Sequence, residues 1–168
     1  KLTMPVCCDA VYSIFSSSIS STMPSQILEI NIIGNRAIPE GFFDSNSYTE
    51  KISLDDEITI INDGAIRNLS SLKEIKMPKN IEHIGIKNFI YTNKNVNIIF
   101  PSNAYYQSVS DNTAIIDLRT KTLICGNEYT VIPTSVVNIG DYAFYGMIVD
   151  SYSVPVGIQK IGNGAFQQ

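Results

Sequence analysis

Few residues in this 168-residue chain combine the side chains and the spacing that catalysis or metal binding needs. The only histidine, His83, lies in an isoleucine-rich stretch that we expect to be extended, so its side chain should face solvent. A lone histidine with no second histidine or cysteine nearby favours neither a metal site nor a catalytic base. The only acidic run, Asp55-Asp56-Glu57, lacks the spacing of an EF-hand loop, which favours a solvated corner over a cation site.

Motifs for nucleophilic catalysis and for cofactor binding are also missing from the sequence. No G-x-S-x-G, G-x-G-x-x-G or Walker sequence occurs, and one histidine cannot activate the many serines. The three cysteines, Cys7, Cys8 and Cys125, do not form a disulfide framework, because the first two are adjacent and would strain a mutual bridge. We therefore expect no enzymatic activity, no cofactor and no metal.

A second set of residues could form a binding surface instead. They alternate with apolar residues in short runs such as Leu28-x-Ile30-x-Ile32, which predict strands with one buried face. Because side chains alternate across a strand, the intervening residues point outward, and in stacked strands they form a ladder. This face is either an ordinary solvated surface or a binding surface, and Ile99 is aliphatic where polar residues are expected. The candidates are Glu29, Asn31, Lys51, Ser53, Glu74, Lys76, Asn97, Ile99, Ser151 and Ser153.

The strands recur because the chain consists of repeats of 22 or 23 residues. The isoleucines that precede each turn segment follow one another in steps of 23, 23, 55 and 22 residues, and the apolar residue five positions further on repeats with the same steps. The two columns are Ile38, Ile61, Ile84, Ile139 and Ile161, and Phe43, Ile66, Phe89, Phe144 and Phe166. A period of this size is typical of stacked arrays, in which each unit buries its apolar side against its neighbours.

Each unit is expected to contain a strand, a corner, a second short extended arm and about one helical turn. Pro78 and Pro101 end their strands, because proline removes a ladder donor. The glycine of each Ile-Gly pair, as in Ile84-Gly85, is expected to permit a turn that other residues resist. The sequences Asp-Tyr-Ala-Phe and Asn-Gly-Ala-Phe then predict the helical turn, with Phe144 and Phe166 in the core. The last strand is expected around residues 152–154.

One segment departs from the period, because Pro101 and Pro133 lie 32 residues apart. Two β-like runs, Thr113–Leu118 and Thr122–Cys125, predict a hairpin that replaces a helical turn, within an insertion at about residues 105–130.

Both ends of the chain also differ from the repeats. Residues 1–26 form either an N-terminal cap or a degenerate repeat ahead of the array of residues 27–168, with a short helix that would place Val6, Ala10, Val11, Ile14 and Phe15 on one side. The chain starts at Lys1 rather than methionine, so we expect a processed or truncated product that has lost any export signal. Gln168 is expected to be a truncation point or to leave an uncapped apolar layer.

Composition excludes several other classes of protein. Apolar residues make up 44% of the chain and charged residues 17%, with no tryptophan, which favours strands and turns over disorder or a coiled coil. The net charge is −4 and no basic patch occurs, so we expect no nucleic-acid partner. No apolar run approaches the roughly 20 residues of a membrane span, so we expect no direct membrane insertion.

The repeat columns resemble the BspA-like leucine-rich repeats of surface and secreted proteins from gut and oral bacteria and some protists. The resemblance covers about residues 27–168 and follows the pattern L-x-x-I-x-I-P-x-x-V-x-x-I-G-x-x-A-F. Residues 72–89 match it closely, with Asn88 in place of the alanine, and Ile132–Phe144 and Val154–Phe166 match best. The hairpin segment, with Tyr106–Asp111 and Leu123-Ile124, is similar to a variant that the family uses.

The resemblance implies a leucine-rich-repeat solenoid, α/β but mostly β and right-handed, with a parallel sheet, short helical turns and one repeat replaced by a β-hairpin. It also implies surface display and roles in binding or adhesion to host proteins rather than catalysis. We therefore expect a non-catalytic interaction module, at the cell surface or secreted, whose sheet face binds a host or neighbouring-cell protein, such as an extracellular-matrix or surface protein, or a glycan. The alternative is a structural spacer or stalk of a larger exported protein. A contiguous apolar or aromatic patch on the ladder would favour binding, and an evenly polar ladder would favour the spacer.

Overall fold

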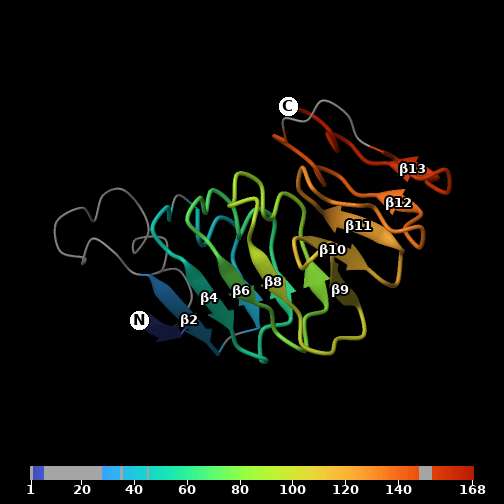
Figure 1. The fold of residues 1–168 in the computed structure, drawn as a ribbon. Helices are drawn as coiled ribbons and strands as arrows, with labels where there is room; N and C mark the ends of the chain where they lie inside the picture. Colours follow the sequence, from blue (N-terminus) through green and yellow to red (C-terminus); the bar gives the residue numbers. More distant parts are fainter. Residues whose placement is uncertain (1, 6–27, 35, 45, 148–152) are drawn as a thin grey trace.

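The computed structural model describes residues 2–5, 28–34, 36–44, 46–147 and 153–168. In these residues the chain forms a solenoid of stacked coils that consist of strands and turns, with no helix (Figure 1). The strands make up three sheets, which we call sheets A, B and C. We name each coil by the residue that occupies the isoleucine column, in chain order Ile38, Ile61, Ile84, Leu123, Ile139 and Ile161. Because the described residues contain no helix, none of their segments is a helix that could span a membrane.

Sheet A contains the alternating strands and is parallel throughout. Its order is β1 (Leu2–Pro5), β2 (Glu29–Ile33), β4 (Lys51–Leu54), β6 (Glu74–Lys76) and β8 (Asn97–Ile99) (Figure 1). Ile30, Ile52, Ile75 and Ile98 are buried in one register across the four later strands, which confirms the predicted one-sided burial. Strand β1 was not predicted, and the helix predicted over Val6–Phe15 lies outside the described residues.

Sheet B consists of the second extended arms. Strands β3 (Ala37–Ile38), β5 (Ile60–Ile61) and β7 (His83–Ile84) pair in parallel, so that Ile38, Ile61 and Ile84 stack in register and are buried. The isoleucine column seen in the sequence is therefore the seam between neighbouring coils.

The predicted helical turn is wrong. In the Ile139 coil, successive N–H groups alternate between a carbonyl three residues back and a carbonyl of the next coil. Within the coil, the Ala143 nitrogen donates to the Gly140 carbonyl at 3.3 Å and the Tyr145 nitrogen to the Tyr142 carbonyl at 3.1 Å. Between the coils, the Phe144 nitrogen donates to the Ala165 carbonyl and the Gly146 nitrogen to the Gln167 carbonyl, both at 2.8 Å. An α-helix directs every N–H along its own axis, whereas here every second one joins two coils. The segment is therefore a chain of turns, and Tyr142 adopts a left-handed φ of 59°.

The repeated glycine is required for a different reason from the predicted one. Gly85 and Gly162 do not have left-handed backbones, but a Cβ on Gly85 would lie 2.6 Å from the nitrogen of Asp63, and one on Gly162 would lie 2.5 Å from that of Asp141. At these two corners the backbone of the preceding coil lies too close for any side chain. The aspartates also link the coils, because Asp63 Oδ1 accepts a hydrogen bond from the Ile86 nitrogen at 2.9 Å.

Sheet C begins with the predicted hairpin and resumes the stack of short arms. Strands β9 (Tyr106–Val109), β10 (Ala114–Asp117) and β11 (Thr122–Cys125) form an antiparallel meander, with a register shift between Ile115 and Ile116. The β10–β11 hairpin was predicted, and the β9 strand was not. Strands β12 (Asn138–Ile139) and β13 (Lys160–Ile161) then add in parallel to β11.

The Leu123 coil is shorter than the others at its corner. Leu123 pairs with Ile139 and thus holds the place of the column isoleucine. In the Ile139 coil, the residue five positions after the column isoleucine, Phe144, donates its N–H to the Ala165 carbonyl of the next coil. In the Leu123 coil, the equivalent bond is made only three positions after Leu123, from the Gly126 nitrogen to the Ala143 carbonyl. The Leu123 coil therefore lacks two corner residues, and at this corner the Ile84 and Ile139 coils face each other directly.

The core comprises two apolar clusters. One lies inside sheets A and B and includes Tyr106, Ile115 and Cys125 of sheet C, and the other consists of residues from 114 onward. Phe43, Ile66, Phe89 and Phe144 are buried, as predicted, but Phe166 is only half-buried and Ile161 is 53% exposed. Ile161 lies on β13, the last strand of sheet C, so no further strand of the described residues covers it. The strand predicted around residues 152–154 is also wrong for Ser153 and Val154, which belong to no strand because sheet A ends at β8.

Candidate functional site

The predicted ladder is present on the outer face of sheet A as two columns. The register joins Glu29, Lys51, Glu74 and Asn97 in one column, and Asn31, Ser53, Lys76 and Ile99 in the other. Neighbouring members of a column are about 4.8 Å apart, the spacing between paired strands. Ser151 lies outside the described residues, and Ser153 is exposed but not part of the sheet.

Charges of opposite sign alternate along the first column. Lys51 Nζ lies 3.7 Å from Glu74 Oε1, and their side chains are 54% and 39% exposed, so the pair adds little to stability. In the second column, Asn31 Nδ2 donates to Thr3 Oγ1 at 3.4 Å, which extends the column onto β1. Apart from the half-buried Ile99, the other seven side chains are polar, so the ladder has no contiguous apolar patch.

The other residues singled out for their chemistry have structural roles or solvent contact. His83 is exposed on the outer side of β7. Asp56 accepts a hydrogen bond from the Lys79 nitrogen at 2.9 Å, and this bond is the main cause that lowers the pKa of its carboxyl. Asp55 Oδ1 accepts one from the Glu57 nitrogen at 2.9 Å. The acidic run thus shapes a corner and ties it to the next coil, and no group of three or more potential metal ligands occurs among the described residues.

The thiol of Cys125 is enclosed in the core. Burial raises its pKa to about 12, so the group stays protonated near neutral pH and is a poor nucleophile. Cys7 and Cys8 lie outside the described residues.

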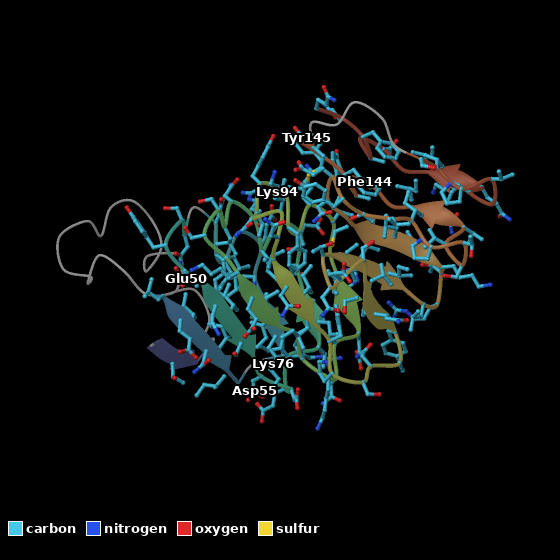
Figure 2. All side chains as sticks on the ribbon, viewed as in Figure 1. Glu50, Asp55, Lys76, Lys94, Phe144 and Tyr145 are labelled. Carbon is cyan, nitrogen blue, oxygen red and sulfur yellow. The ribbon has the colours of Figure 1, made fainter. Side chains whose placement is uncertain are left out.

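A cluster of tyrosines on the turn side was missed by the sequence analysis. The ring centroid of Tyr145 lies 6.0 Å from that of Tyr91 and 5.6 Å from that of Tyr142, both edge to face. Lys87 Nζ lies 4.5 Å from the centroid of Tyr142. Tyr91 and Lys87 belong to the Ile84 coil and the other two tyrosines to the Ile139 coil, so these contacts pass over the shortened Leu123 coil. Figure 2 shows Tyr145 at the opposite end of the molecule from Lys76 of the ladder.

The repeat alignment contains a signal for this cluster. Three positions after the column isoleucine, the backbone is left-handed in each coil that has this corner, with φ between 57° and 66°. That position is glycine in three coils, Gly41, Gly64 and Gly164, but Lys87 and Tyr142 in the two coils that flank Leu123. A left-handed conformation costs a residue with a side chain roughly 1 kcal/mol or more. Lys87 and Tyr142 therefore carry a backbone strain that glycine avoids at the same position in the other coils.

The exposed edge of sheet B is closed by side chains of the meander. The hydroxyl of Tyr106 accepts a hydrogen bond from the Ile84 nitrogen at 3.2 Å and donates to the Glu82 carbonyl at 3.3 Å. Arg119 donates to the same carbonyl at 3.0 Å and to the Tyr106 hydroxyl at 2.8 Å, while Asp117 holds its guanidinium at 2.8 Å. Covering an edge strand in this way blocks unwanted strand addition.

These features define a mostly-β solenoid repeat protein with parallel sheets. The sequence pattern of the BspA-type leucine-rich repeat region matches residues 9–113 and 124–168 in six copies. The chain therefore belongs to the BspA-type leucine-rich repeat family, as the resemblance indicated.

Two solved structures are similar to this chain. One is a leucine-rich repeat protein from Eubacterium ventriosum, with 18% identity and a TM-score of 0.48 over 84% of this chain and 51% of that one. The other is the pneumococcal vaccine antigen PcpA, with 20% identity and a TM-score of 0.52 over 83% of this chain and 48% of that one. This chain thus spans about half the length of either structure, and the likeness to PcpA supports the fold alone. No curated protein matches the chain.

Proposed function

We propose that this chain is a non-catalytic interaction module of a surface-exposed or secreted protein, and that the outer face of sheet A binds a protein or glycan partner. Membership of the BspA-type family supports this role. One structure with the same fold is a pneumococcal vaccine antigen, a description that fits exposure at a cell surface.

The observation that carries the proposal is the unbroken register of the ladder over β2, β4, β6 and β8. The solenoid fixes the separation of the eight side chains, so a partner loses little entropy in ordering them. Because Glu29, Lys51 and Glu74 alternate in sign along one column, only a surface with the complementary alternation matches them. Such a face provides specificity rather than a large apolar contribution to affinity.

The test compares capture of purified extracellular-matrix proteins, and of glycans on an array, by the parent chain and by a triple variant. The variant Lys51→Ser, Lys76→Ser and Ile99→Ser removes two cations and the one aliphatic side chain of the ladder. We expect captured partner to fall about tenfold or more, since a few central residues dominate most interfaces. Equal capture by the variant and the parent would exclude this face.

A matched control variant removes the same residue types elsewhere. Lys79→Ser, Lys121→Ser and Val131→Ser lie outside sheet A, and Val131 is 77% exposed. We expect this control to capture partner as the parent does. Both triple variants should unfold at the parent's urea concentration, because the changed residues are not part of the buried core.

The spacer role is the second candidate, and the polarity of the ladder favours it. If neither the parent nor the control captures any probe, the chain acts as a structural segment that holds other parts of an exported protein at a fixed separation. Attachment of a fluorophore to each end and measurement of their distance would then show a single narrow distribution.

A further inference from the structure

A cleft of about 320 Å³ opens beside the shortened corner of the Leu123 coil. Four coils contribute to its lining, with Ile86 from the Ile84 coil, Ile124 from the Leu123 coil, Asp141 from the Ile139 coil and Lys160 from the Ile161 coil. The volume lies within the range of small-molecule sites. The cleft is separate from the outer face of sheet A, so a ligand site here is independent of the binding role proposed for that face.

Two strained residues bridge the rim of this cleft. Lys87 and Tyr142 directly follow the lining residues Ile86 and Asp141, and they contact each other at 4.5 Å. Both have left-handed backbones, with φ of 60° and 59°, at a position where the other coils carry glycine. Strain that persists at the rim of a concave site is an indication of function.

The surroundings of the cleft do not favour an added peptide strand. Strand β11 is already paired on both sides, with β10 and β12. On β7, the Ile84 nitrogen and the Glu82 carbonyl are bound by the side chains of Tyr106 and Arg119. A peptide would therefore find no open edge on β7 or β11, and a ligand between these two strands has to bind through side chains.

The chemistry of the lining matches a sugar ring. The exposed side chain of Ile86 and the half-buried side chain of Ile124 supply the apolar part of the lining, which also contains the polar residues Thr122, Asn138, Asp141 and Lys160. Asn138 donates its amide to the Thr120 carbonyl at 3.0 Å, which orients its side chain, and Asp141 Oδ1 accepts from the Asn163 nitrogen at 2.8 Å. A pyranose has an apolar C–H face and a rim of hydroxyls that donate to carboxylate and amide oxygens and accept from an ammonium. We propose that this cleft binds one sugar residue of a glycan.

The test is a titration of the whole chain, labelled with ¹⁵N, followed by amide chemical shifts. The probes are the methyl glycosides of glucose, galactose, mannose, N-acetylglucosamine and N-acetylneuraminic acid. We expect at least one probe to shift the amide signals of Gly85, Gly140 and Gly162 saturably at about 10 mM, a concentration that fills a site of millimolar affinity. Those glycines line the cleft, and Gly157, whose Cβ position has no neighbour within 4 Å, is the internal control.

Two surface variants test whether the shifts report this site. Thr122→Val removes a hydroxyl while keeping the shape of the side chain, and Lys160→Ala removes an exposed cation. We expect each to weaken binding about fivefold or more, whereas Lys79→Ala, outside the cleft, leaves it unchanged. Absence of shifts with all five probes, equal binding by Thr122→Val, Lys160→Ala and the parent, or a response to extended peptides but not to sugars would each overturn the proposal.

Discussion

The close approach of neighbouring coils at Gly85 leads to a sharp prediction about stability. A Cβ at this position would lie 2.3 Å from Asp63 Oδ1, 2.6 Å from the Asp63 nitrogen and 2.8 Å from the Asn62 carbonyl carbon. Ordinary contact begins near 3.4 Å, and two of these three atoms belong to the backbone, so rotation of the Asp63 side chain cannot relieve the overlap. In Gly85→Ala the Ile84 coil therefore has to move away from the Ile61 coil by about 1 Å.

That displacement weakens two hydrogen bonds between the coils. The Gly85 nitrogen donates to the Ile61 carbonyl at 2.7 Å, and the Ile86 nitrogen donates to Asp63 Oδ1 at 2.9 Å. Each bond contributes about 1 kcal/mol, and overpacking a close-fitting contact costs about 1–3 kcal/mol. We expect Gly85→Ala to lower the free energy of unfolding by about 2–4 kcal/mol, measured by urea titration with circular dichroism.

The chain offers a matched control in Gly157→Ala. Nothing lies within 4 Å of a Cβ at Gly157, so this variant should unfold within about 0.5 kcal/mol of the parent. Gly162→Ala has the same overlap as Gly85→Ala but lies in the coil of β13, which is paired on one side only, so its cost should be smaller. If Gly85→Ala is as stable as Gly157→Ala, the close approach of the coils is not what selects glycine here.

Three further predictions concern buried polar groups. Asn88→Ala restores the alanine of the repeat pattern but removes the oxygen that accepts a hydrogen bond from the Ile66 nitrogen at 2.9 Å. We expect the free energy of unfolding, measured by urea titration, to fall by about 1–3 kcal/mol, and an increase in stability would contradict this role. Burial raises the pKa of Cys125 to about 12 from an ordinary 9.0, so above pH 9 the unfolded chain binds fewer protons than the folded one and stability falls. Between pH 9 and 12 the parent should lose up to about 1.4 kcal/mol per pH unit relative to Cys125→Ala, and parallel pH profiles of the two would refute this. Tyr106→Phe leaves the Ile84 nitrogen without its hydrogen-bond acceptor. We expect the free energy of unfolding to fall by about 1–3 kcal/mol and light scattering to increase, because molecules can then associate through this edge of sheet B. An unchanged urea midpoint and unchanged scattering would show that other groups close the edge.

The strands and their inner faces were predictable because they depend on local alternation. Ile30 and Ile32 are buried and Asn31 between them faces outward, and the same pattern in β4 placed Lys51 and Ser53 correctly. The common period then predicted the register, since residues 22 or 23 positions apart must stack if the core is to be continuous. The ladder of sheet A results from these two facts, and the β10–β11 hairpin results from its own local pattern.

The prediction failed where one coil acts on another. Asp-Tyr-Ala-Phe resembles the start of a helix, but Phe144 donates its N–H to Ala165 of the next coil, and that bond excludes the helix. The predicted strand around residues 152–154 has the correct alternation, but its described residues Ser153 and Val154 pair with no strand, since sheet A ends at β8 in the part of the chain that the structure describes. Neither competing interaction can be read from the segment itself.

The sequence by itself determined that this chain is a stacked repeat array with Ile, Leu and Phe columns inside and a polar ladder outside, because period and alternation are properties of neighbouring positions and of fixed spacing. Only the tertiary structure decided how the coils meet. The glycines Gly85 and Gly162, the two missing residues of the Leu123 coil and the contact of Lys87 with Tyr142 across it depend on distances of a few ångströms between segments far apart in the sequence. Such distances arise from packing, which no local pattern encodes.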